Sequence, residues 1–171
     1  MDENKKKVSA KQEKMVADAL GGYVVGMSGA APANPGDVKT YDWLIECKTH
    51  TTPDHPIFFD IGVWSKICTE AMAMHRKPLL VVDDGSQRIG QTWCLCNSKN
   101  LNLTRVIVTD IPVSIRKNIS CKHDKLKSAL EKNTKRYLGE FYEGAAFEVE
   151  GWAKDPVCIL PLELFKELMD K

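Results

Sequence analysis

The chain has 171 residues, of which 43% are hydrophobic and 27% are charged, and its formal net charge is +1. This length and hydrophobic fraction predict one globular domain with a full core, and no internal repeat, low-complexity tract or long linker interrupts it. A charge so close to neutral argues against a protein that binds nucleic acid through its overall field. Any such contact must therefore come from local groups of lysine and arginine.

The cysteines and the N-terminus indicate the compartment. Six cysteines are scattered along the chain, and several lie within apolar runs, as is typical of buried thiols in a reducing environment. The N-terminus is charged and lacks an apolar signal segment, and no apolar run approaches the ~20 residues of a membrane span. We therefore expect an intracellular, cytoplasmic protein without membrane contact.

A helix is predicted near the N-terminus, after a charged, solvated arm over residues 1–8. Ser9 and Gln12 have the spacing of a capping box, so the helix is expected to begin at Ser9 and to run to about Leu20. Glu13 lies on or beside the inward stripe of this helix, where it either reaches back to water or serves a functional site. The apolar residues of the stripe are Val16, Ala17 and Leu20.

The acidic stretch from Gly36 to Lys48 is the most informative part of the sequence. Two β-prone runs, 38–40 and 43–49, flank a two-residue turn and predict a hairpin. In that register Asp37 faces Glu46 with Cβ atoms roughly 5 Å apart, which costs stability. Alternation places Lys48 on the face of Glu46. A divalent metal and the lysine ammonium are the two candidates to offset this repulsion.

The rest of the chain predicts alternating helices and strands. Asp60 is expected to cap a helix that ends before Pro78, and the apolar run Leu79–Val82 is typical of a buried strand. Strand, helix and strand in this order imply a right-handed crossover and a mixed sheet. Further strands are expected at 23–25, 92–96, 103–109, 146–149 and 157–160. Further helices are expected at 121–137 and from Pro161 or Leu162 to Met169.

Pro35-Gly36-Asp37 followed by Glu46-Cys47-Lys48 resembles the motif of the PD-(D/E)XK nuclease superfamily. The order of elements, from a helix with Glu13 through the acidic hairpin to a helix and a Val-Val strand, is similar to Holliday junction resolvases of the archaeal type and to their phage-encoded relatives. The resemblance covers residues 9–96. It implies an α/β fold, a restriction-endonuclease-like core with a mixed central sheet flanked by helices. We expect a single domain over 1–171, in which residues 97–171 form a C-terminal extension packed on the core.

The resemblance also implies a chemistry and a set of site residues. Asp37 and Glu46 would bind Mg²⁺ through carboxylate oxygens, with the backbone carbonyl of Cys47 as a further ligand, and Mn²⁺ is expected to substitute. Glu13 would complete the acidic cluster or hold a metal-bound water, and Lys48 would orient or help deprotonate the attacking water. Mg²⁺ prefers hard oxygen ligands and keeps several waters, so two or three carboxylates suffice. The expected reaction is phosphodiester hydrolysis that leaves 5′-phosphate and 3′-hydroxyl ends.

Branched DNA and a second copy of the chain are the expected partners. Lys11, Lys14 and the backbone at Ser28 would contact phosphates, although lysines on one helix face are as often merely solvated. A four-way junction has two strands to cut symmetrically, which favours a two-fold homodimer. Gly26 stands where the archaeal resolvases usually carry arginine, and the loop 28–35 is longer than theirs. These two departures bear on the preference for four-way junctions and leave the resemblance to a nuclease unchanged. A phage-encoded enzyme would act in the host cytoplasm.

Three alternatives remain open on the sequence. One is another PD-(D/E)XK endonuclease, of restriction or nicking type. Another is a DNA-binding module in which the acidic cluster is structural only. The third is a zinc site, although its spacing misses the usual knuckle and alternating cysteines on a strand are readily explained as core. The candidate zinc ligands are Cys94, Cys96, Cys121 and His123.

Overall fold

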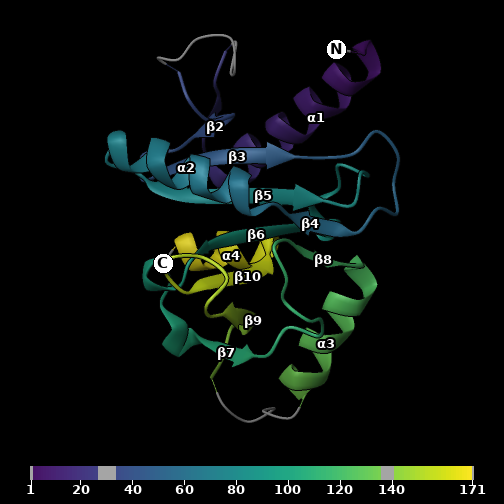
Figure 1. The fold of residues 1–171 in the computed structure, drawn as a ribbon, viewed down its shortest axis with the longest axis vertical. Coiled ribbons are helices and arrows are strands. Elements are labelled where there is room, and N and C mark those ends of the chain that lie inside the picture. Colours follow the sequence, from purple (N-terminus) through teal and green to yellow (C-terminus); the bar gives the residue numbers. More distant parts are fainter. Residues whose placement is uncertain (1, 27–33, 136–140, 171) are drawn as a thin grey trace.

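An eight-stranded mixed sheet forms the centre of the molecule (Figure 1). The computed structural model describes residues 2–26, 34–135 and 141–170. The strand order is β1-β2-β3-β5-β6-β10-β9-β7, and β4 and β8 form a separate two-stranded sheet. This confirms the prediction of an α/β fold with a mixed central sheet. The strands are β1 (Tyr23–Val24), β2 (Val38–Lys39), β3 (Trp43–Lys48), β4 (Ile57–Phe59), β5 (Lys77–Asp83), β6 (Thr92–Asn97), β7 (Val106–Thr109), β8 (Ile119–Cys121), β9 (Gly144–Val149) and β10 (Val157–Pro161).

Helices cover both faces of this sheet. Figure 1 shows α2 in front of the sheet and α4 behind it, and each face has its own hydrophobic core. One core takes side chains from α2 and α3, and the other takes side chains from α1 and α4. Burial on both faces explains why the central strand β5 reads as a continuous apolar run. The helices are α1 (Glu3–Leu20), α2 (Ile61–Ala73), α3 (His123–Lys135) and α4 (Leu162–Met169).

The first helix is longer than the sequence predicts. α1 begins at Glu3 rather than Ser9, because the Asp2 side chain caps it by accepting a hydrogen bond from the Asn4 N–H at 3.2 Å. No residue that breaks a helix separates this cap from the expected start. The helix ends as expected at Gly21, which adopts a left-handed conformation with φ of 66°. The charged arm expected over residues 1–8 is therefore mostly helical.

The parallel pairing of β3 and β5 confirms the predicted strand–helix–strand crossover through α2. β3 and β5 run parallel, with Trp43 opposite Lys77 at their starts and Lys48 opposite Val82 at their ends. The neighbouring strands are antiparallel, apart from β7, which runs parallel to β9. Strands β10, β9 and β7 come from the C-terminal part of the chain, so residues after 97 extend the same sheet.

Two local predictions differ from the structure, and a third falls outside the described residues. Cys121 ends strand β8 and does not begin a helix, because β8 pairs with β4, a strand that sequence periodicity did not reveal. Leu103–Arg105 forms a 3-10 turn before β7. Tyr137, expected at the end of the helix, lies outside the described residues. Among the described helices, none combines the length and the apolar character needed to span a membrane.

The predicted cap of α2 is present and can be tested. The Asp60 carboxylate accepts a hydrogen bond from the Val63 N–H at 3.0 Å. Replacing Asp60 with Ala leaves that N–H without its partner, and we expect the free energy of unfolding to fall by about 0.5–2 kcal/mol. Urea denaturation measures the change. Asp60→Asn keeps an accepting oxygen and serves as the control, so an equal loss in both variants would contradict the capping role.

Candidate functional site

The hairpin that carries the acidic residues folds in the predicted register. Val38 lies opposite Ile45. The Asp37 N–H donates a hydrogen bond to the Ile45 carbonyl oxygen at 2.8 Å. This hydrogen bond ends at Ile45, the residue already opposite Val38, so Asp37 and Val38 share one partner and Asp37 lies beside the Ile45–Glu46 step of β3. The predicted pairs of Val38 with Ile45 and of Lys39 with Leu44 are confirmed, and both acids lie near the Lys48 ammonium at this end of β3.

Asp37 is held by the backbone of the neighbouring strand. The chain turns away from β3 at Gly36, where φ is 76° and an added Cβ would lie 2.7 Å from a Leu44 methyl carbon. Beyond this turn β3 has no backbone partner from β2. The Cys47 N–H donates instead to the Asp37 carboxylate, with N and Oδ2 2.8 Å apart. This hydrogen bond fixes one carboxylate oxygen at the edge of the sheet.

Cys47 contributes backbone groups to this edge, while its side chain points into the core. Residues two apart in a strand direct their N–H and C=O groups to the same side, so the Cys47 carbonyl, like that of Ile45, faces the side on which Asp37 stands. The thiol is buried, and burial raises its pKa well above the ordinary value, with the Asp37 charge acting in the same direction. The thiol therefore stays protonated, and the carbonyl is the group that faces the site.

Lys48 forms an ion pair with Glu46 on the same face of β3. The Lys48 ammonium lies 2.6 Å from Glu46 Oε1, and the side chains are 50% and 12% exposed. Burial lowers the pKa of Lys48, but the hydrogen bond to Glu46 and the charges of Glu46 and Asp37 outweigh this, so the pKa is raised overall. Lys48 is consequently a permanent cation beside the two acids.

Glu13 approaches the same edge from the other face of the sheet. α1 packs on the core that contains Cys47, whereas Glu46 points to the opposite face. Glu13 is half-buried, and burial, followed by the charges of Asp37 and Glu46, raises its pKa from 4.5 to about 7. The three acids are therefore close enough to repel one another, although Glu13 reaches them around the edge of β3.

Gln12 anchors the helix that carries Glu13, and the sequence pattern did not assign it this role. The side chain is 1% exposed, and its Nε2 donates to the Lys48 carbonyl oxygen at 2.8 Å. This bond ties α1 to the end of β3. Its position in the sequence could have indicated this role, because Gln12 lies four residues before Val16 on the inward stripe, where a buried polar side chain needs a hydrogen-bond partner.

Asp83 is a second buried polar residue close to this edge of the sheet. It lies at the end of β5 and is fully buried, and its Oδ1 accepts hydrogen bonds from the Thr49 hydroxyl at 2.5 Å and from the Gly85 N–H at 2.9 Å. These bonds hold the segment that follows Lys48 against β5. Asp83 thus supports the end of the strand that carries the candidate site.

The oxygen groups at this edge are of the kind that binds a hard cation. No three or more His, Cys, Asp or Glu side chains among the described residues are grouped closely enough to hold a metal as they stand. Asp37 and Glu46, with the Cys47 carbonyl between them, nevertheless supply hard oxygens at one edge, which suits Mg²⁺ because this ion keeps several waters.

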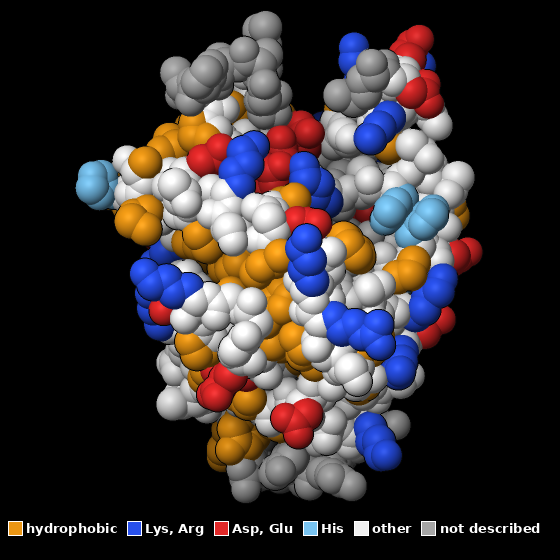
Figure 2. All heavy atoms as spheres, in the orientation of Figure 1, with side chains coloured by type: hydrophobic (Ala, Val, Ile, Leu, Met, Phe, Trp, Pro, Cys, Tyr) orange, Lys and Arg blue, Asp and Glu red, His pale blue; other side chains and the backbone are white. Residues whose placement is uncertain are grey.

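Basic side chains surround this acidic edge. Figure 2 shows a group of acidic side chains on the floor of a hollow near the top of the molecule, with basic side chains on its rim. Of the residues expected to contact DNA, Lys11 and Lys14 are exposed on α1, and Lys14 is ion-paired with Asp18 at 3.2 Å. Ser28 lies outside the described residues.

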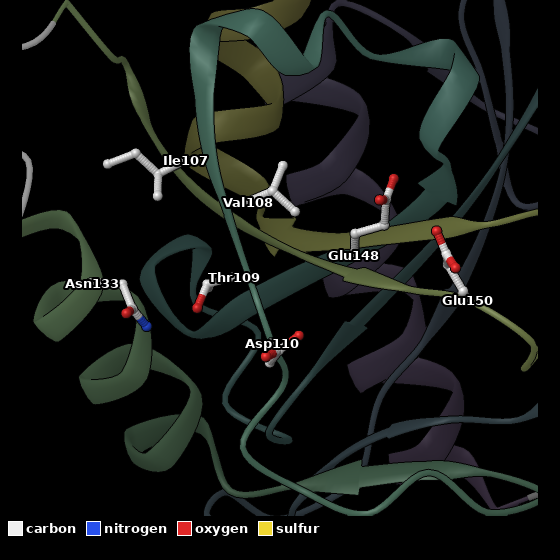
Figure 3. Close-up of a pocket in the computed structure, with 7 residues that line it drawn as sticks. All are labelled: Ile107, Val108, Thr109, Asp110, Asn133, Glu148 and Glu150. Atoms are coloured by element: carbon white, nitrogen blue, oxygen red, sulfur yellow. The ribbon is translucent and has the colours of Figure 1, made fainter.

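A separate cavity of about 440 Å³ lies at the far end of the sheet, beside the edge strand β7 (Figure 3). Its lining includes three carboxylates, from Asp110, Glu148 and Glu150, together with the amide of Asn133. An acidic lining repels phosphate groups. This cavity therefore does not suit a nucleic acid. It is also separate from the acidic edge, because β7 and β3 are not neighbours in the sheet.

The alternative zinc ligands are not brought together. Cys94 and Cys96 are buried in the core beneath α1 and α4, whereas Cys121 is buried in the core on the other face of the sheet. The Nδ1 of His123 accepts a hydrogen bond from the Trp93 indole at 3.1 Å. The cysteines therefore act as core residues in this structure.

No model of a known protein family, no curated protein and no solved structure matches this chain.

The raised pKa of Glu13 predicts a pH-dependent stability in the absence of metal. Between the unfolded pKa of 4.5 and the folded pKa of about 7, the folded protein retains a proton that the unfolded chain has lost, so stability falls as pH rises through this window. Glu13→Gln removes this contribution. Denaturation of the metal-free proteins at about pH 5 and about pH 8 should therefore show a smaller loss of stability in the variant than in the wild type.

The matched control for this experiment is Asp18→Asn, which changes an exposed carboxylate on the same helix. It should keep the pH dependence of the wild type. If Glu13→Gln also keeps it, Glu13 is not coupled to the acids of the hairpin.

Proposed function

We propose that this chain is a Mg²⁺-dependent DNA endonuclease of the PD-(D/E)XK type, and that it hydrolyses phosphodiesters at four-way DNA branches. The observation that carries this proposal is the Asp37 carboxylate held on the Cys47 N–H, near Glu46 and the Lys48 ammonium. Two acids and a lysine on adjacent strands at an exposed edge match the motif that the sequence resembles. The edge also lies in a hollow that a DNA backbone can approach.

Asp37, Glu46 and the Cys47 carbonyl are the groups that would hold the metal ion. When bound, the ion supplies Lewis-acid chemistry, by lowering the pKa of a water and offsetting charge on the phosphate. Asp37 is already oriented by its bond to the Cys47 N–H, so little side-chain freedom is lost on binding. Mn²⁺ should serve in place of Mg²⁺ because it also accepts hard oxygen ligands.

Lys48 and Glu13 would act on the water and the phosphate. The raised pKa of Lys48 keeps its ammonium protonated, so Lys48 orients the attacking water and offsets phosphate charge but does not remove a proton from the water. The Glu13 carboxylate is placed to accept a hydrogen bond from water at the same edge. Attack on phosphorus would leave 5′-phosphate and 3′-hydroxyl ends.

Branched DNA and a homodimer belong to the same proposal. Symmetric cutting of a junction needs two sites, which a two-fold dimer supplies. A second candidate is an endonuclease of restriction or nicking type on the same core. It is favoured by the three strands β10, β9 and β7, which lie outside the region of resemblance and enlarge the sheet.

Cleavage of a substrate panel tests both candidates. Labelled duplex, flap, three-way and four-way DNA are incubated with Mg²⁺, with Mn²⁺ and with Ca²⁺. Paired symmetric nicks at four-way branches alone support the resolvase, whereas nicks in linear duplex support the second candidate. Ca²⁺ should allow binding with little cutting.

Glu46→Ala and Lys48→Ala should each lower the cleavage rate at least about a hundredfold, because each removes a charge placed at the reacting phosphate. DNA binding in Ca²⁺, measured by fluorescence anisotropy, should persist in both variants. Glu163→Ala and Lys166→Ala, which alter exposed charges on α4, are the matched controls and should cut at the wild-type rate. Normal cutting by both site variants would show that the site is assigned wrongly, and a wild type that cuts no DNA would reject the nuclease.

A further inference from the structure

A cleft of about 500 Å³ opens where β5 begins, at the other end of the central strands from the acidic edge. We call it the α2 cleft, because α2 forms one wall and residues 153–155, before β10, form another. β3 and β5 are parallel, and the cleft includes Lys77 and Pro78 at the start of β5, whereas the candidate nuclease site stands where β3 ends. The two sites therefore do not overlap.

The α2 cleft contains apolar side chains that continue the core out to the surface. Trp64, Cys68 and Met72 lie four residues apart on α2 and so share one stripe of the helix. Trp64 is 2% exposed, Cys68 is half-buried and Met72 is 74% exposed. Figure 2 shows an apolar band below α2, with basic side chains at its left margin. A flexible thioether at the open end of such a stripe suits contact with an apolar side chain of a partner.

Cations outnumber acids around this apolar stripe. Its lining includes Arg76, Lys77, Lys99 and Lys154 but a single carboxylate, Asp155, which pairs with Lys99 at 3.2 Å. Within the part of the chain that the structure describes, the other three cations form no ion pair. The positive charge of the α2 cleft is therefore largely uncompensated.

The orientation of these cations is partly set by the fold. The Arg76 Nε donates to the Thr40 carbonyl oxygen at 3.1 Å, which fixes the plane of the guanidinium group. The Lys77 ammonium stands 5.5 Å from the centre of the Trp43 ring, which packs on the α4 side of the sheet, so Lys77 contributes its backbone and stem to the cleft and not its charge. Lys39 is buried nearby, and burial, then the charge of Arg76, lowers its pKa. A partner carboxylate would relieve the repulsion among these cations.

We propose that the α2 cleft binds an acidic peptide segment of a partner protein, in which an aliphatic or aromatic side chain lies next to Asp or Glu. The apolar side chain occupies the space against Cys68 and Met72, and the carboxylates face Arg76 and Lys154. A single nucleic acid strand is less suited to this cleft, because bases stack on exposed aromatic rings and Trp64 is almost fully buried. Charge complementarity and the apolar stripe together define the partner.

Fluorescence anisotropy with designed probes tests the proposal on the full chain. The probes are a short labelled peptide of Glu and Leu, the same peptide with every Glu replaced by Lys, and a labelled DNA duplex. The Glu/Leu peptide should bind saturably and the Lys/Leu peptide should not. Lys154→Glu reverses an exposed charge of the cleft, and Met72→Ala removes its exposed apolar side chain. Each should weaken binding of the Glu/Leu peptide at least about tenfold.

Lys132→Glu is the matched control, since Lys132 is an exposed lysine on α3 that does not line the cleft. It should bind the Glu/Leu peptide as the wild type does. Absence of saturable binding up to about 1 mM peptide would overturn the proposal. So would equal binding of both peptides, or binding of the DNA duplex that Lys154→Glu abolishes while the Glu/Leu peptide is unaffected.

Alkylation of Cys68 supplies an independent readout of the site. Cys68 is half-buried while the other five cysteines are buried, so a maleimide should label it first in the folded protein. Burial, followed by the charge of Asp155, raises its pKa to about 11, so labelling is done at mildly alkaline pH. The Glu/Leu peptide should slow this labelling and the Lys/Leu peptide should not. Unchanged labelling at saturating peptide would place the binding outside the α2 cleft and overturn the assignment.

Discussion

The hydrogen bond between the Cys47 N–H and the Asp37 carboxylate determines the geometry of the acidic end of the molecule. In an antiparallel pair a backbone carbonyl would ordinarily accept this N–H, but β2 is only two residues long and the chain turns away at Gly36. The carboxylate takes the place of that carbonyl at 2.8 Å. Asp37 is thereby attached to the same strand that carries Glu46 and Lys48, and their relative positions follow from the strand itself.

The charges at this edge are only partly balanced by the protein. The Lys48 ammonium offsets Glu46, while Glu13 stands near both hairpin acids with a pKa raised to about 7. Gln12 keeps α1, and with it Glu13, against the end of β3 despite the repulsion. An arrangement of this kind gains from a further cation, which is the physical basis for the proposed Mg²⁺ chemistry.

The parallel pairing of β3 and β5 separates two surfaces of opposite charge. The acidic edge lies where β3 ends, and the cationic α2 cleft lies where β5 begins. Loops at the carboxyl ends of parallel strands commonly form ligand sites in open α/β sheets. The α2 cleft stands at the other end, so a peptide bound there leaves the acidic edge open to a nucleic acid.

Local sequence alone determined the hairpin register, the Asp60 cap of α2 and the buried strand that follows α2, because turns, caps and side-chain alternation act over a few residues. It also placed Glu13 beside an inward stripe. Only the tertiary structure decided that Glu13 meets the hairpin around the edge of β3, that Gln12 secures the helix, and that β8 pairs with the distant β4. These contacts join segments far apart in the chain, so they depend on how whole elements pack against one another, and no local periodicity encodes them.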